Sequence, residues 1–87
     1  DSTQALELSY PPELRHARVG GDALVEFVVD TAGAVEPETV GLVAATRPEF
    51  GRAARAAALS AKFLPAQRQG RPVRQLIQLP LRWDPQR

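Results

Sequence analysis

The 87 residues of this chain suffice for one domain and leave no room for a second core. The chain has no cysteine, which excludes disulfides and thiolate metal sites, and no apolar run approaches the ~18–20 residues that would span a bilayer. It also lacks methionine, even at position 1, so we expect these residues to be a processed or trimmed part of a longer protein.

The net charge of +1 conceals an asymmetry between the two halves of the chain. Residues 1–46 hold eight acidic and two basic residues, a balance of −6, whereas residues 47–87 hold nine basic and two acidic residues, a balance of +7. Such a split can steer a charged partner toward one half. Alternatively, the two halves pack together and neutralise each other within one fold.

The first predicted helix opens at Tyr10-Pro11-Pro12, after a lead-in of residues 1–9 that shows no clear periodicity. Proline is tolerated in a first helical turn because its missing N–H would be unpaired there in any case. Gly20-Gly21 follows the helix. Since glycine takes the left-handed cap conformation without strain, we expect the glycine pair to end it.

Residues 22–30 alternate in hydropathy and predict a strand. Its buried face is expected to carry four apolar residues: Ala23, Val25, Phe27 and Val29. Asp30-Thr31-Ala32-Gly33 is a turn signal, so we expect a hairpin into a second strand over residues 35–43. Pro37 interrupts that second strand, which is therefore either bulged at Pro37 or begins only after it.

The second predicted helix is the clearest element. Thr46 and Glu49 have the spacing of a capping box, with a hydroxyl and a carboxylate three residues apart. Apolar residues then recur at helical spacing on one face: Phe50, Ala54, Ala57, Ala61 and Leu64. The small alanines allow the helix to lie close to a sheet, and Pro65 is expected to end it.

A polar loop over residues 67–72 leads into the last predicted strand, residues 73–83. One face of this strand carries Val73, Ile77, Leu79, Leu81 and Trp83 together with Gln75. The opposite face carries Arg74, Leu76, Gln78, Pro80 and Arg82. Pro80 cannot donate to a β-ladder, so this strand belongs at a sheet edge or at a bulge.

The predicted fold class is α+β, a two-layer sandwich in which a three-stranded antiparallel sheet packs against two helices. We expect a lead-in over residues 1–9, one domain over 10–84 and a tail over 85–87. The predicted core contains Phe27, Phe50, Phe63, Ile77 and Leu79, and Trp83 is expected to cover it as a lid.

These elements resemble, in their order, the C-terminal domain of the TonB family from Tyr10-Pro11 to about Trp83. The shared features are the Tyr-Pro opening, Gly21 before the first strand, the Asp30-x-x-Gly33 turn, the aromatic-x-Pro helix exit Phe63-Leu64-Pro65, and Gly70-Arg71-Pro72-Val73 before the last strand. No single feature is specific, and their order and spacing together carry the resemblance. Two departures stand out: these residues include no membrane anchor or proline-rich spacer, and Pro80 removes a donor from the strand expected to pair. If the missing N–H of Pro80 faces the partner, the ladder is shorter than in the family, whereas the opposite orientation leaves the docking edge intact.

The resemblance implies a periplasmic protein-binding domain, tethered to the inner membrane by a segment outside this chain and driven by an inner-membrane motor complex. It also implies that an extended segment of an outer-membrane TonB-dependent transporter adds as a strand beside the last strand. On this basis we predict partner contacts at seven residues: Tyr10, Pro11, Arg74, Gln75, Leu76, Gln78 and Arg82. No cofactor, metal or small-molecule substrate is implied.

Each of these residues also has a purely structural interpretation. Tyr10 and Pro11 would then only fasten the first helix to the sheet. Arg74, Gln78 and Arg82 would form a solvated face that discourages aggregation. At the level of the whole domain, the alternative function is a static accessory subunit that uses the same fold to brace a larger membrane complex.

Two further classes of function are disfavoured. Nucleic-acid binding is suggested by the nine basic residues of the second half, but the predicted exposed strand faces offer no aromatic side chain for stacking on bases. Catalysis is disfavoured because His16, the single histidine, has no cysteine or pair of acids near it in sequence, and Glu36 and Glu38 flank a proline with no predicted pocket.

Overall fold

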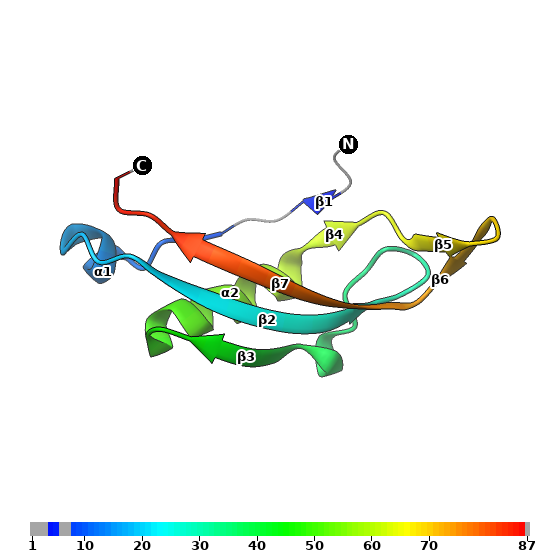
Figure 1. The fold of residues 1–87 in the computed structure, drawn as a ribbon, viewed down its shortest axis with the longest axis horizontal. Coiled ribbons are helices and arrows are strands. Elements are labelled where there is room, and N and C mark those ends of the chain that lie inside the picture. The colour runs from blue at the N-terminus through cyan, green and yellow to red at the C-terminus, as the bar shows by residue number, and fades with distance from the viewer. Residues whose placement is uncertain (1–3, 6–7, 87) are drawn as a thin grey trace.

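The centre of the fold is strand β2 (Gly21–Val29). A computed structural model describes residues 4–5 and 8–86 of the chain (Figure 1). In it β2 lies between β3 (Gly41–Ala45) and β7 (Gln75–Trp83) in an antiparallel sheet of order β3-β2-β7. The predicted inward face of β2 is confirmed, since its four apolar residues are at most 4% exposed.

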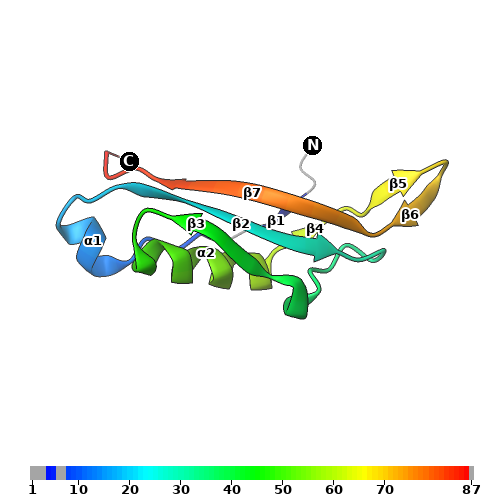
Figure 2. The same cartoon turned by 60° about the horizontal axis from the view of Figure 1, so that its bottom comes forward.

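Helix α2 (Pro48–Ser60) lies along one side of this sheet (Figure 2). Its predicted apolar stripe is confirmed for Phe50, Ala54, Ala57 and Ala61, which are all at most 4% exposed. Alanines keep the helix close to the strands, and Phe50 fills the space between helix and sheet. The α+β fold class, with a three-stranded antiparallel sheet and two helices, is therefore confirmed.

The start of α2 differs from the predicted capping box. Arg47 occupies the N-cap position, and no side chain in the described part of the chain caps it. Thr46 Oγ1 instead accepts a hydrogen bond from the Asp22 backbone N (3.0 Å). The prediction is wrong because the sheet uses this hydroxyl to join the end of β3 to β2. The Glu49 Oε1 atom is left buried without a partner among the described residues.

The end of α2 was also predicted wrongly, since the helix stops at Ser60 and not at Pro65. Strand β4 (Lys62–Phe63) follows and pairs with β1 (Gln4–Ala5), which lies in the predicted lead-in. The Phe63 N–H donates to the Gly33 carbonyl (3.0 Å). These bonds take the chain off the helix axis, so Leu64 is 68% exposed and does not continue the apolar stripe.

Helix α1 (Pro12–His16) forms at one end of the sheet, but the glycine pair does not end it. Arg18 takes the left-handed conformation (φ 57°), and its N–H donates to the Arg15 carbonyl while the Val19 N–H donates to the Leu14 carbonyl. This is the hydrogen-bond pattern of a Schellman motif. Gly21 serves packing instead, because a Cβ there would collide with the Phe50 ring.

The turn after β2 forms as predicted. The Asp30 carboxylate accepts hydrogen bonds from the backbone N–H groups of Ala32 and Ala34 (2.9 Å each), and Gly33 has a φ of 89°. Val35 makes one bridge to Val29, and a 3₁₀ turn, η1 (Pro37–Thr39), then precedes β3. Of the two alternatives for Pro37, the second is correct, because the strand begins only at Gly41.

The predicted polar loop over residues 67–72 is largely a hairpin of β5 (Ala66–Arg68) and β6 (Arg71–Val73). Gln69 (φ 52°) and Gly70 (φ 78°) form its tip, and two successive positive φ values are characteristic of a type I′ hairpin turn. Figure 1 shows the hairpin extending beyond the end of the sheet. Arg74 separates β6 from β7, so the last strand starts at Gln75 and not at Val73.

Two of the predicted core residues, Phe27 and Phe50, are fully buried. Near the C-terminal end of β7, Trp83 is 3% exposed and stacks on Phe50 with 4.5 Å between the ring centroids. The predicted position of Trp83 as a core lid is thus confirmed. The other three predicted core residues, Phe63, Ile77 and Leu79, are only half-buried and pack against the buried core.

Candidate partner-binding edge

Strand β7 forms one edge of the sheet. It pairs with β2 in unbroken antiparallel register, from Gly21 opposite Trp83 to Val29 opposite Gln75. Among residues 4–5 and 8–86, no second strand pairs with β7. The placement of this strand at a sheet edge, predicted from Pro80, is therefore confirmed, and one side of its backbone lies open in the described structure.

The hydrogen bonds of β2 determine which β7 residues face that open side. At one end of β2 the Thr46 N–H donates to the Asp22 carbonyl (2.9 Å), and at the other the Glu36 N–H donates to the Val28 carbonyl (2.9 Å). Even-numbered residues of β2 therefore direct their backbone groups away from β7. Because successive residues of a strand point these groups to opposite sides, the odd-numbered residues of β2 bond to β7.

The register then assigns the two sides of β7. Leu81, Leu79 and Ile77 lie opposite Ala23, Val25 and Phe27 and exchange backbone hydrogen bonds with them. The residues between them direct their backbone groups to the open edge: Leu76, Gln78, Pro80 and Arg82. Pro80 fits β7 without disturbing the sheet because its missing N–H lies on the side where β2 needs no donor. The same orientation leaves a gap in the row of donors at the open edge.

Three of the seven predicted partner-contact residues lie on the face of β7 opposite α2. Leu76 is 63% exposed there. Gln78 Nε2 donates to Glu26 Oε1 (3.0 Å), and Arg82 Nε donates to Asp22 Oδ1 (3.3 Å). Gln75, the first residue of β7, is exposed and opposite Val29. These contacts join side chains of the acidic first half to side chains of the second half, so the charge asymmetry is partly balanced across β2 and β7.

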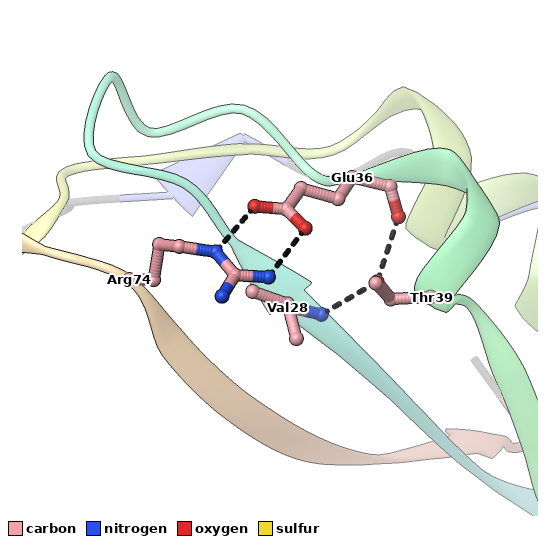
Figure 3. Close-up of polar contacts among 4 residues, drawn as sticks. All are labelled: Val28, Glu36, Thr39 and Arg74. Atoms are coloured by element: carbon pink, nitrogen blue, oxygen red, sulfur yellow. Dashed lines mark hydrogen bonds and ion pairs between the residues drawn. The ribbon is translucent and has the colours of Figure 1, made fainter.

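Arg74, just before β7, makes the shortest of these side-chain contacts (Figure 3). Its Nε and Nη2 atoms donate to the two carboxylate oxygens of Glu36 at 2.7 Å each, a bidentate geometry that Arg favours. The hydrogen bond from Arg74 is the main reason that the pKa of Glu36 lies below its usual value. Beside it, Thr39 Oγ1 donates to the Glu36 carbonyl (2.7 Å) and accepts from the Val28 N–H (2.8 Å). The start of β7 is thereby held to the η1 turn.

Tyr10 and Pro11 lie at the other end of β7. The Tyr10 hydroxyl donates to the Val19 carbonyl (2.6 Å), and its ring meets the Phe50 ring edge-on at 6.0 Å. The Pro11 carbonyl accepts hydrogen bonds from the N–H groups of Leu14 and Arg15 in α1. Both residues are half-buried and have structural partners, and partner contact remains a prediction for them. The structure does bring Tyr10 and Arg82 to the rim of one shallow hollow at the end of β7.

A second, mainly apolar depression of about 340 Å³ crosses the uncovered face of the sheet. Its outward-facing lining comes from all three strands and includes Leu24, Ala44 and Pro80. Within the described residues there is no cluster of three or more potential metal ligands. None of the helices described here is both long enough and apolar enough to cross a membrane.

The edge strand was identified from the sequence, which left open whether the missing N–H of Pro80 faces a partner. The Pro80 carbonyl faces the open edge and was absent from the predicted contacts, because alternation with Leu79 and Leu81 does not show which side of the strand is unpaired. The hairpin β5–β6 was missed as well, and the Gln69-Gly70 pair was its available signal.

Comparison with known protein families gives one match. The family described as the Gram-negative bacterial TonB protein C-terminal matches residues 7–85, which is nearly the whole chain. A search of curated proteins found no significant match.

Proposed function

Since the chain belongs to the TonB C-terminal domain family, we propose that it captures an extended segment of an outer-membrane transporter as an added strand along the open edge of β7. Domains of this family are periplasmic in Gram-negative bacteria, and they act in protein interaction and energy transduction and not in catalysis. In this proposal a segment outside the chain tethers the domain to the inner membrane, where a motor complex acts on it.

The single observation that carries the proposal is the one-sided pairing of β7. An edge strand presents N–H and C=O groups that an extended peptide can bond, which gives affinity without requiring a deep pocket. Leu76 and Gln78 each offer a donor and an acceptor at this edge, whereas Pro80 offers only its carbonyl. Each backbone bond contributes about 0.5–1.5 kcal/mol net, which offsets the ordering of the peptide only in part. We therefore expect affinity on the order of micromolar.

The proposal is tested by adding a transporter-derived extended peptide to the isotope-labelled domain and following the amide NMR signals. We expect the signals of residues 75–82 to move first. Movement confined to Arg52, Arg55 and Lys62, which lie on α2 and at the start of β4, would contradict docking at β7.

A matched pair of variants at position 78 isolates the backbone contribution. Gln78→Pro removes an N–H from the open edge, and Gln78→Ala removes the same side chain but keeps that N–H. Both should stay folded, because this N–H does not bond to β2. We expect Gln78→Pro to bind the peptide about two- to tenfold more weakly than Gln78→Ala. Equal affinity of the two folded variants would contradict strand addition at this edge.

A further inference from the structure

The side of β7 that faces α2 is covered unevenly along its length. Toward the C-terminal end, Leu81 is 8% and Trp83 is 3% exposed. Trp83 is held there by its stacking on Phe50 and by a hydrogen bond from its Nε1 atom to the Ser9 carbonyl (2.8 Å). That end of the strand is closed by the protein itself.

The first half of β7 is different. Ile77 and Leu79 are only half-buried, although their partners on β2, Phe27 and Val25, are fully buried. Both pairs lie on the same face of the same sheet, but β2 has a strand on each side and lies under α2 together with β3, whereas β7 has a strand on one side only. A strand added beside β7 would cover the exposed flanks of Ile77 and Leu79 as β7 covers β2.

The backbone of the open edge points to the same half of β7. Leu76 and Gln78 can each donate and accept there, and they flank Ile77. Pro80 interrupts the row of donors next to Leu79, so a ladder that starts at Leu76 loses a bond on reaching Pro80. Uncovered apolar surface and intact donors therefore coincide over Leu76–Leu79, and neither observation depends on the other.

We propose that β7 accepts a short amphipathic strand along Leu76–Leu79, with apolar side chains on the α2 side and polar side chains on the other, and that Pro80 ends the ladder. The inference rests on the proposed function, because it specifies the segment that the open edge takes. Apolar residues of the strand extend the core beside Ile77 and Leu79. The opposite face remains in water next to Gln78 and requires polar residues. Alternation with a period of two is the pattern that satisfies both faces.

A second copy of the chain fits this edge less well than a foreign strand does. A two-fold antiparallel pair of β7 strands that brings Ile77 of one copy beside Leu79 of the other places Pro80 of each copy opposite Leu76, so a bond is lost at both ends of the short ladder. A foreign strand without proline that pairs only along Leu76–Leu79 loses none. The occupant is therefore a segment of another protein.

Two peptides of about eight residues and of identical composition test the inference. In the first, apolar and polar residues alternate; in the second, the same residues stand in adjacent apolar and polar pairs. A strand of the second kind has apolar residues on both faces in every register. We expect the alternating peptide to bind at least about tenfold more tightly. Its amide shifts should concentrate on residues 75–79.

Three protein variants complete the test. Pro80→Ala restores an N–H at the open edge, so the shifts should extend to Arg82 and affinity should rise about two- to tenfold. Leu79→Ser should weaken binding of the alternating peptide, whereas Leu59→Ser, at an exposed position of α2, should change it little. The amide spectrum of each variant establishes that it is folded.

The outcomes separate the inference from the proposed function. Equal binding of the two peptides at β7 would overturn the proposal that the bound segment is amphipathic. It would leave the proposal of docking at β7 intact. If neither peptide perturbs β7 but a transporter-derived segment binds on α2, both proposals fail. A concentration-dependent dimer in sedimentation, with β7 as its interface, would overturn the choice of a foreign strand.

Discussion

The two edges of the sheet are built differently. β3 is five residues long, its register with β2 shifts between Leu24 and Val25, and its side chains Leu42 and Val43 are 41% and 49% exposed. β7 is nine residues long and keeps an unbroken register. A short, bulged strand is a poor template for another chain, whereas a long regular strand is a good one. The comparison indicates that this domain discourages pairing at β3 and permits it at β7.

The largest expected effect is at the closed end of β7. Trp83→Ala removes the stack on Phe50 and the hydrogen bond to the Ser9 carbonyl, and it leaves a cavity. We expect the free energy of unfolding to fall by about 3–5 kcal/mol in urea denaturation. Val43→Ala on β3 is the control, with an expected change within about 0.5 kcal/mol because Val43 is half exposed. A small loss for Trp83→Ala would show that β7 is not anchored at this end.

The second largest effect on the free energy of unfolding is expected in the central strand, β2. Gly21→Ala places a Cβ against the Phe50 ring and the Thr46 side chain, where a methyl group does not fit. We expect a loss of about 1–3 kcal/mol in the same measurement. Gly41→Ala, at the start of β3, is the matched control, since the nearest atom to its new Cβ is Glu26 Cγ at 3.9 Å. Similar losses for the two variants would contradict the tight packing at Gly21.

The third effect concerns the side of β2 that faces β3. There, beyond the end of β3, the Thr39 side chain bonds to the β2 backbone in place of a strand. Thr39→Val removes the hydroxyl that accepts the Val28 N–H and donates to the Glu36 carbonyl. We expect a loss of about 1–2 kcal/mol and faster amide exchange at Val28. Thr39→Ser keeps the hydroxyl and should retain most of the stability. A loss for Thr39→Val no larger than that for Thr39→Ser would contradict the role of the hydroxyl.

The smallest effect is the pH dependence of the contact between Glu36 and Arg74. The pKa of Glu36 is lowered in the folded state, so the pair adds stability above the carboxyl's ordinary pKa of about 4.3. That stability is lost as pH falls through the lowered pKa, because the folded state must then bind a proton. We expect Glu36→Gln to lower the urea midpoint at neutral pH, with a smaller difference near about pH 3. A difference that grew on acidification would contradict the pair.

Much of the fold followed from local patterns. Alternation in residues 22–30 identified β2 and its buried face, and helical spacing from Phe50 to Ala61 identified the face of α2. The wrong predictions concern groups that form hydrogen bonds with residues far away in the sequence. Thr46 bonds to Asp22 in place of capping α2, and the chain after Ser60 pairs with Gly33 and β1 in place of extending the helix. No local rule shows such partners, because they are far apart in sequence.

For the candidate site, too, some features were predictable from the sequence and others were not. Pro80 restricted the last strand to a sheet edge or a bulge, since proline can donate no bond to a ladder, and alternation in residues 73–83 placed Ile77, Leu79 and Leu81 on one face. These consequences follow from covalent structure and periodicity. The register between β2 and β7 decided which side of β7 is open and that the missing donor of Pro80 lies on that side. The packing of the strands also left Ile77 and Leu79 only half-buried. A register depends on which strands meet, and only the packed tertiary structure brings them together.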